Sequence, residues 1–269
     1  MNKTPSLFSE IKGDGHPLLV LHGFTGDRST MSSISEPLSE NYSVISVDLP
    51  GHGNTLKDIE PHLFNFEDTL KALIEVMEFY GLEEFNVLGY SMGGRLSLGL
   101  ATKYPNIIKN TILIGATAGI ADENQRIARR RSDDRLAEEI LEKGVEWFVE
   151  YWMEQPIFES QIRIDSETFD AYKKQRLQNN AQGLAKSLRG SGTGSQPSLW
   201  RKLNEINSPT LILVGEEDPK FRSLAVRLNS GISKSEIVVV PESGHACHLE
   251  NPDFTLEMIE TFLEEVLSR

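Results

Sequence analysis

Three polar residues with complementary chemistry each come shortly after an apolar run of this sequence. They are Ser91, in the motif Gly89-Tyr90-Ser91-Met92-Gly93, then Asp218, then His245. A hydroxyl becomes a base or a nucleophile when a histidine takes its proton, and a carboxylate fixes the tautomer of that histidine. The three residue types, in this order and each after an expected strand, predict a catalytic triad in which Ser91 is the reacting group.

The serine motif has the spacing of a sharp turn between a strand and a helix. The apolar run 85–88 precedes it, and residues 95–101, which have helical character, follow it. Glycines two positions before and two after Ser91 let strand and helix approach closely, and a strained apex exposes the hydroxyl. The alternative is a tight corner without chemistry, and the strand and helix on either side favour the catalytic interpretation.

Each partner of Ser91 has a neighbour of the same type. Glu216 and Glu217 compete with Asp218 as the acid, but the proline that follows Asp218 restricts it to an extended or turn conformation that suits a carboxylate crossing the sheet edge. His248 competes with His245 as the base, and we expect it in the first turn of the last helix. His22 also follows a strand, where we expect it to brace a loop.

The apolar runs define the elements that must position these residues. Strands are predicted at 18–21, 44–49, 85–88, 111–114, 209–215 and 237–240, and helices at 68–80, after Ser91 and at 251–267. Strands that alternate with helices form a doubly wound, mostly parallel sheet, so the chain belongs to the α/β class. In such a sheet the loop 22–26, after the first strand, can present the backbone N–H of Phe24 to a ligand.

Residues 116–207 contain no convincing buried strand. Helical segments rich in arginine and glutamate occupy 122–143, 145–154 and 167–188. We therefore predict a core of residues 1–115 and 208–269, with a helical cap at 116–207 inserted after the strand at 111–114. A cap emerging at the carboxyl edge of the sheet would cover the ligand site, although a purely structural helical subdomain has the same pattern.

Composition excludes several classes of function. The formal net charge of −13 argues against a nucleic-acid or anionic-membrane partner. The single cysteine, Cys247, forms no internal disulfide, and neither a zinc-binding spacing nor a membrane-length apolar run occurs. The segment 190–195 is rich in glycine but lacks the context of a phosphate loop, so a flexible loop is expected. We expect a cytoplasmic protein without a metal, a monomer or a weak homo-oligomer.

Arginines are concentrated in and near the expected cap. Arg95 lies one helical turn after Ser91, and Arg176 lies in the last cap helix. Five further cap arginines cluster on one segment: Arg126, Arg129, Arg130, Arg131 and Arg135. Such charges commonly form a solvated helix face, but above a reactive serine they also suit the bidentate binding of carboxylates. Trp147 and Trp152 are expected as core anchors of the cap, and one of them can line the pocket.

Several stretches resemble a known family. The whole chain is similar to α/β-hydrolases, in which the triad occurs in the same order. More selectively, it resembles the 2-succinyl-6-hydroxy-2,4-cyclohexadiene-1-carboxylate synthases of menaquinone biosynthesis. The stretches that carry this resemblance are Gly89-Tyr90-Ser91-Met92-Gly93-Gly94-Arg95, Ala128-Arg129-Arg130-Arg131-Ser132-Asp133, Trp152-Met153-Glu154-Gln155-Pro156-Ile157-Phe158, Gly192-Thr193-Gly194-Ser195-Gln196-Pro197-Ser198-Leu199-Trp200 and Gly215-Glu216-Glu217-Asp218-Pro219-Lys220-Phe221.

The resemblance implies a lyase without a cofactor. Ser91, aided by His245 and Asp218, would abstract a ring proton from an anionic polycarboxylate that then loses pyruvate. The backbone N–H groups of Phe24 and Met92 would form the oxyanion hole. The residues implied in substrate binding are Tyr90, Arg95, Arg129, Trp152 and Arg176.

Two other interpretations remain open from the sequence. One is a hydrolase of carboxylic esters or carbon–carbon bonds that uses the same triad with a positioned water and a less cationic pocket. The other is a ligand-binding protein that kept the fold and lost the chemistry. The second usually lacks a member of the triad, and here all three are present.

Overall fold

The computed structural model describes residues 4–55 and 59–267. Seven strands form one sheet in the order β1-β3-β2-β4-β5-β6-β7. Their bounds are β1 Ser9–Lys12, β2 His16–Leu21, β3 Tyr42–Val47, β4 Phe85–Tyr90, β5 Ile108–Ile114, β6 Thr210–Gly215 and β7 Ser235–Val240. All neighbouring strands are parallel except β1, which pairs antiparallel with β3. The predicted doubly wound, mostly parallel sheet is confirmed.

Strand β1 is the one strand of the described sheet that the hydrophobic pattern does not predict. Its sequence, Ser-Glu-Ile-Lys, is short, and three of its four residues are exposed. An edge strand buries little apolar surface and carries charges that discourage further pairing, so it lacks the apolar run typical of the central strands.

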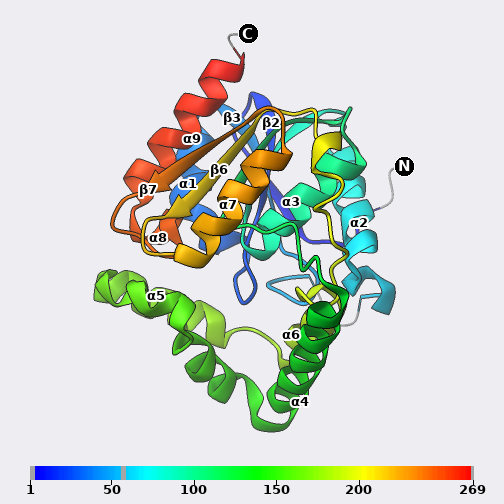
Figure 1. Ribbon diagram of the computed structural model, residues 1–269, viewed down its shortest axis with the longest axis vertical. Helices are drawn as coiled ribbons and strands as arrows, with labels where there is room; N and C mark the ends of the chain where they lie inside the picture. Colours follow the sequence, from blue (N-terminus) through cyan, green and yellow to red (C-terminus); the bar gives the residue numbers. More distant parts are fainter. Residues whose placement is uncertain (1–3, 56–58, 268–269) are drawn as a thin grey trace.

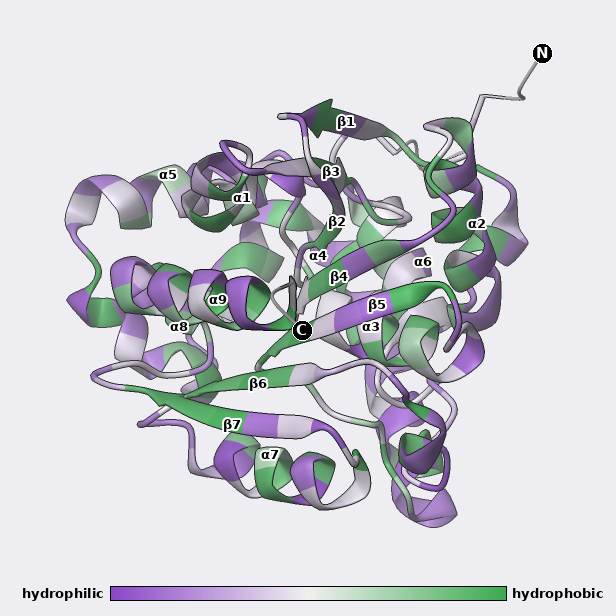
Figure 2. Cartoon of the chain, turned by 90° about the horizontal axis from the view of Figure 1, so that it is seen from above, coloured by the Kyte–Doolittle hydropathy of each residue, from purple (hydrophilic) through white to green (hydrophobic). Residues whose placement is uncertain are grey.

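Helices cover both faces of the sheet (Figures 1 and 2). Alternate residues of β2 supply the two cores: Leu19 and Leu21 pack with α2, α3 and α7, whereas Leu18 and Val20 pack with α1 and α9. This alternation follows from the two-residue period of a strand, and burial on both faces explains the continuous apolar runs. The core helices are α1 Ser32–Leu38, α2 Phe66–Phe79, α3 Met92–Lys103, α7 Pro219–Gly231, α8 Cys247–Glu250 and α9 Pro252–Leu267.

The remaining helices lie between β5 and β6 in the chain and form a separate layer beyond one end of the sheet (Figure 1). They are α4 Glu123–Met153, the 3-10 segment η3 Pro156–Arg163, α5 Ser166–Leu177 and α6 Ala181–Ser191. Helices α4 and α6 enclose a small apolar core of their own, which includes Phe148 and Leu184. We call this layer, residues 116–207, the cap.

The cap helices differ in one respect from the prediction. The break between 122–143 and 145–154 is present as a kink at Gly144, whose φ is +87°. The prediction of a single helix at 167–188 is wrong, because α5 ends at Leu177 and α6 begins at Ala181. Asn180 caps α6 by accepting hydrogen bonds from the N–H groups of residues 182 and 183, and this local capping ends the continuity that the composition suggested.

The glycine-rich segment 190–195 is only partly the loop that was predicted, since residues 192–195 alone lie outside helices and strands. Its first two residues belong to α6, and Ser191 is buried. The Ser191 carbonyl accepts a hydrogen bond from Arg95, and the N–H of Gly194 donates to Asp133 at 3.2 Å. Gly194 packs so closely on Arg130 that a Cβ would lie 2.3 Å from its backbone nitrogen, so glycine here permits close packing.

No helix within the described ranges is long and apolar enough to cross a membrane.

Candidate active site

Ser91 lies at the apex between β4 and α3, with φ +49° and ψ −101°. This positive φ is costly for a residue with a side chain. A Cβ on Gly89 would lie 2.3 Å from the carbonyl carbon of Gly93, and a Cβ on Gly93 would lie 2.2 Å from the Leu21 oxygen. Glycine is therefore required on both sides of the turn, as its spacing predicted.

The structure brings Ser91, His245 and Asp218 into one hydrogen-bonded chain. His245 Nε2 lies 3.0 Å from Ser91 Oγ, and His245 Nδ1 lies 3.0 Å from Asp218 Oδ2. The other Asp218 oxygen accepts from the N–H of Phe221 at 3.0 Å, which anchors the carboxylate at the start of α7. With Nδ1–H donating to Asp218, Nε2 is free to accept the serine proton, which is the arrangement of a proton-transfer triad.

The competing residues lie elsewhere. Glu217 pairs with Arg163, and Glu216 accepts from the N–H of residue 242. His248 is buried in the short helix α8, so its predicted place in the first turn of the last helix is wrong. Asn251 separates α8 from α9, a boundary that the hydrophobic pattern did not mark.

His22 lies beneath the loop that follows β2. Its Nε2 accepts from the N–H of Leu49 at 3.0 Å, so its Nδ1 carries the hydrogen and donates to the Gly23 carbonyl at 2.7 Å. Burial lowers the pKa of His22, which favours the neutral ring. Both ring nitrogens form hydrogen bonds with the backbone, so His22 stabilises the loop, as predicted.

Two backbone N–H groups are available beside the serine. Within residues 4–55 and 59–267, the N–H groups of Phe24 and Met92 have no hydrogen-bond acceptor in the protein. Phe24, Ser91 and Met92 line the same cavity, and the N–H of Met92 belongs to the first turn of α3, where donors are unpaired. This arrangement can stabilise negative charge on an oxygen held next to Ser91.

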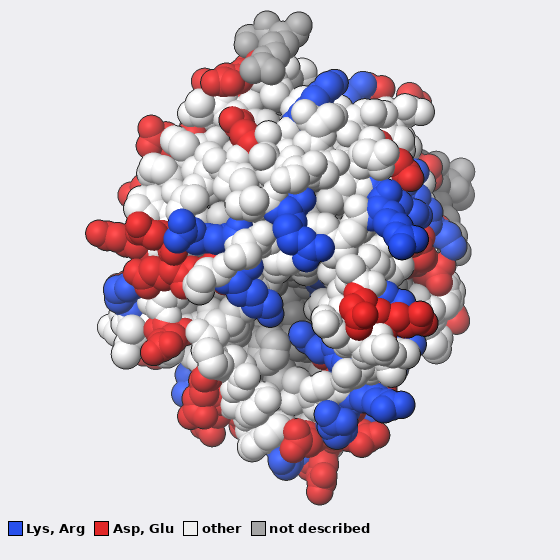
Figure 3. Space-filling view, in the orientation of Figure 1, with Lys and Arg blue, Asp and Glu red and all other residues white. Residues whose placement is uncertain are grey.

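The cavity over Ser91 has a volume of about 480 Å³. Its lining includes His245, Trp152 and Phe158, together with the cations Arg95, Arg129, Lys220 and Arg227. One carboxylate, Asp122, accompanies those four cations in the lining. Lysine and arginine side chains surround a hollow on this face of the molecule (Figure 3). Although the protein is acidic as a whole, its cavity is therefore positively charged.

Arg95 is buried in this cavity without a carboxylate partner among the described residues. Its Nη1 donates to the Ser191 carbonyl at 2.7 Å and to Gln196 Oε1 at 3.0 Å, both of which are neutral acceptors. Burial, with repulsion from Arg129, lowers the pKa of Arg95 to about 10. The nearby carboxylate of Asp133 acts in the opposite direction, and the guanidinium, which forms no ion pair among the described residues, remains charged at neutral pH.

Arg129 is held differently. Its Nε donates to Asp133 at 2.7 Å, one turn along α4, and its side chain is 41% exposed. Asp133 also receives the N–H of Gly194, so this pair joins α4 to the segment after α6. Of the two tryptophans of α4, Trp152 lines the cavity, whereas Trp147 stacks on Tyr151.

Arg176 and Tyr90 lie apart from the other predicted binding residues. They line a neighbouring cavity of about 20 Å³, which shares Phe24 and Phe158 with the larger one. Arg176 is 7% exposed, its Nη1 has no partner, and its guanidinium lies 5.2 Å from the centre of the Phe158 ring. The expected grouping of Arg176 with Arg95 and Arg129 in one cavity is thus absent from this structure, because the Phe24 and Phe158 rings lie between.

Helix α7 adds Lys220 and Arg227 to the cavity lining, and no sequence motif had indicated either residue as part of the site. They are seven residues apart, and so lie on one face of that helix. The guanidinium of Arg227 lies 4.0 Å from the centre of the Trp200 ring, which orients it. An i, i+7 pair of cations that begins two residues after the triad aspartate is a pattern that could have indicated them.

The fold and this site define the class of protein. The family model for the alpha/beta hydrolase fold matches residues 16–252, so the chain is a member of the α/β-hydrolases. A thermophilic esterase from Thermogutta terrifontis, solved with malate bound, superposes with a TM-score of 0.84 at 26% identity, over 97% of this chain and 93% of that one.

Closer similarities specify the family. The putative 2-succinyl-6-hydroxy-2,4-cyclohexadiene-1-carboxylate synthase of Bacillus subtilis is 35% identical over 93% of this chain and 90% of the relative. The corresponding synthase of Citrobacter koseri is 32% identical over 93% of this chain and 94% of the relative. MenH from S. aureus has a TM-score of 0.92 at 35% identity and covers 98% of this chain and 100% of its own. The chain belongs to the 2-succinyl-6-hydroxy-2,4-cyclohexadiene-1-carboxylate synthase family.

Proposed function

We propose that this protein is a lyase that eliminates pyruvate from 2-succinyl-5-enolpyruvyl-6-hydroxy-3-cyclohexene-1-carboxylate and forms 2-succinyl-6-hydroxy-2,4-cyclohexadiene-1-carboxylate. One observation carries the proposal: Ser91 Oγ, 3.0 Å from His245 Nε2, opens into a cavity that contains the buried guanidinium of Arg95, which forms no ion pair with a described carboxylate. A simple neutral ester would leave that buried charge unpaired, whereas a polycarboxylate would pair with it. Family membership supports the same assignment.

The reaction begins with proton removal. Ser91 Oγ takes the ring proton next to the succinyl carbonyl as its own proton passes to His245 Nε2, and Asp218 stabilises the resulting imidazolium. The electrons of the broken C–H bond pass through the ring double bond, and the C–O bond to the enolpyruvyl group breaks. Enolpyruvate leaves, takes up a proton and becomes pyruvate. The reaction as written needs no acyl-enzyme and no cofactor.

Backbone and side-chain cations supply the electrostatic stabilisation. As the proton leaves, charge develops on the succinyl carbonyl oxygen, which the N–H groups of Phe24 and Met92 would receive, and each such donor is worth about 3 kcal/mol. Arg95 and Arg129 would bind carboxylates of the substrate, and Trp152 would pack on its ring. A further carboxylate reaching past Phe158 would meet Arg176 and Tyr90 in the small cavity, where Arg176 Nη1 lacks a partner.

The proposal also covers the binding partner, the cellular location and the oligomeric state of the enzyme. The partner is a small anionic polycarboxylate, not a nucleic acid or a membrane, because the net charge of −13 repels both polyanions while the cationic cavity concentrates a small one. We place the enzyme in the cytoplasm, as a monomer or a weak homo-oligomer.

The alternative is a hydrolase, because the same three residues activate a serine for attack on an ester. Two incubations distinguish the functions: one with the enolpyruvyl substrate and one with a neutral aryl ester, each with the same enzyme preparation. We expect pyruvate from the first at a kcat/KM far above that for the ester. Rapid ester turnover without pyruvate would instead assign a hydrolase, and no turnover of either would favour a ligand-binding protein.

A further inference from the structure

The loop that carries the N–H of Phe24 contacts the cap at three hydrogen bonds. We call residues 22–30 the oxyanion loop. Tyr172 Oη donates to the Thr30 carbonyl at 2.7 Å, and Gln175 Nε2 donates to Asp27 Oδ2 at 3.0 Å. Asn179 Nδ2 donates to the Thr25 carbonyl at 2.8 Å. All three donors lie in or just beyond α5, so one cap helix holds the middle and the second end of the loop.

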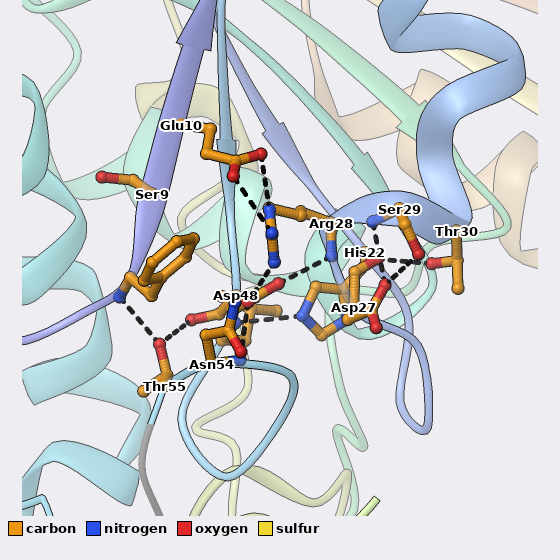
Figure 4. Close-up of polar contacts among 12 residues, drawn as sticks. Ser9, Glu10, His22, Asp27, Arg28, Ser29, Thr30, Asp48, Asn54 and Thr55 are labelled. Atoms are coloured by element: carbon orange, nitrogen blue, oxygen red, sulfur yellow. Dashed lines mark hydrogen bonds and ion pairs between the residues drawn. The ribbon is translucent and has the colours of Figure 1, made fainter. Parts of the chain in front are cut away.

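From the other side, the core holds the same loop. The N–H of Thr25 donates to His52 Nε2 at 3.3 Å, and the N–H of Arg28 donates to Asp48 Oδ1 at 2.8 Å. The side chain of Arg28 bridges Asp48 and Glu10, which extends this network to the edge strand β1 (Figure 4). Asp27 caps the turn by accepting from the N–H and the hydroxyl of Ser29, as Figure 4 also shows.

Thr25 is the residue through which these contacts reach Phe24. Its φ is +72°, a conformation that a residue with a branched side chain adopts only when its surroundings impose it. His52 fixes the N–H of Thr25, and Asn179 fixes its carbonyl, so both peptide groups that flank this residue are held. Without the Asn179 contact, the peptide of the Thr25 carbonyl would be held only by its own N–H, that of Gly26, which donates to the Gly23 carbonyl at 3.1 Å. The Gly23 carbonyl and the N–H of Phe24 belong to one peptide group, so a looser turn here would change the direction of that N–H.

Helix α5 has few buried side chains that could hold it against the rest of the protein. Of its described residues, only Arg176 is buried, so the helix adds little apolar packing of its own. Arg176 lies between Gln175 and Asn179, with its Nη1 buried and unpaired. Helix α5, which contacts the oxyanion loop, therefore also carries a buried guanidinium, that of Arg176, which forms no ion pair with a described carboxylate.

We propose that Tyr172, Gln175 and Asn179 are positioning residues for catalysis, which hold the oxyanion loop so that the N–H of Phe24 faces the oxygen on which charge develops. This inference rests on the proposed function in assuming an oxyanion next to Ser91, but any reaction of that serine with a carbonyl or a boron centre would need the same donor. A purely structural role for α5 would affect stability and leave this donor unchanged.

The test uses a probe that needs no turnover. Phenylboronic acid forms a tetrahedral adduct with an activated serine, and one adduct oxygen occupies the oxyanion hole. We expect Tyr172→Phe, Gln175→Ala and Asn179→Ala each to weaken its binding about threefold to tenfold, as expected for loss of one hydrogen bond, and the triple variant about thirtyfold or more. With substrate, kcat should fall in parallel while KM changes little.

Gln178→Ala is the matched control, because Gln178 is an exposed glutamine three residues after Gln175 whose side chain makes no hydrogen bond to the oxyanion loop. It should bind the boronate as the unchanged protein does. Unaltered boronate affinity and kcat in the three single variants would overturn the proposal, even if the triple variant failed to fold. Absence of pyruvate release with weakened boronate binding would instead reject the lyase assignment and retain the positioning role.

Discussion

Arg95 Nη1 donates a hydrogen bond of 2.7 Å to the backbone carbonyl of Ser191, which lies 96 positions later in the chain. This contact joins α3, the helix that begins after the reactive serine, to the end of the cap helix α6. The guanidinium is thereby fixed at the wall of the cavity over Ser91, and it forms no ion pair with a carboxylate of the described residues. The proposed function thus places anion binding and proton abstraction on one short segment of the chain.

Removal of the Arg95 charge should weaken the enzyme strongly. Arg95→Ala should lower kcat/KM for the polycarboxylate by about 2 to 5 kcal/mol, because a buried carboxylate would lose its partner. Arg130→Ala is the control, because Arg130 is an exposed arginine of the cap. It should change kcat/KM by less than about 0.5 kcal/mol. Steady-state kinetics measure both. Equal behaviour of the two variants would remove Arg95 from substrate binding.

A second prediction compares cavity-lining and exposed cations of helix α7 by their effect on KM. Lys220→Ala and Arg227→Ala should each raise KM about threefold to thirtyfold with a smaller effect on kcat, because each removes one charge from the cavity wall. Arg222 lies on the same helix, is exposed and donates to the Glu216 carbonyl, so Arg222→Ala should leave KM unchanged. A KM that rises as much in the control would indicate an effect of net charge alone.

Close packing at the serine turn predicts a large loss of stability. Gly89→Ala should reduce the free energy of unfolding by more than about 3 kcal/mol or prevent folding, because its Cβ would meet backbone atoms at 2.3 Å. Gly81→Ala is the control: Gly81 has φ +74° with no atom within 4 Å of a Cβ, so it should cost only about 1 kcal/mol. Thermal or urea unfolding compares them, and similar losses would contradict the packing argument.

Buried histidines predict that stability falls in acid. Burial lowers the pKa of His52 and of His248 to about 3, whereas an unfolded histidine titrates near 6.5. Between these values the unfolded chain binds more protons, so stability is complete above about pH 6.5 and declines as pH falls towards 3. At pH 5 each should contribute a loss of about 2 kcal/mol.

Urea unfolding between pH 7 and pH 5 measures this loss. In a His52→Gln variant the change over the same interval should be smaller by about 2 kcal/mol, whatever its absolute stability. An unchanged pH dependence in that variant would show that His52 is not the titrating group.

The fold was predictable from the sequence where local pattern and tertiary environment agree. Central strands such as β2 are buried on both faces and so are continuously apolar, and the glycines around Ser91 reflect a steric requirement. The edge strand β1 and the boundary between α5 and α6 were missed, because one lacks a buried face and the other depends on a capping hydrogen bond from Asn180. Such features depend on partners that hydrophobic periodicity does not record.

Within the candidate site, the three polar residues of the triad could be placed because each follows a strand at the same sheet edge. The positions of the arginines could not, since helix spacing gives a face but not a distance. Arg176 therefore lies in the small cavity beyond Phe158 rather than beside Arg95. The contacts of α5 with the oxyanion loop join residues about 150 positions apart, and no local pattern indicates them.

The central claim is that Ser91 acts as a base for elimination, and the mass of the ring product tests it most directly. Release of pyruvate alone is not decisive, because hydrolysis of the enol ether would release it too. Mass spectrometry after incubation with the enolpyruvyl substrate should show a diene lighter by one water than the hydrolysis product, and Ser91→Ala should form almost none while folding normally. A ring product that retains that water, or undiminished diene formation by Ser91→Ala, would contradict the account.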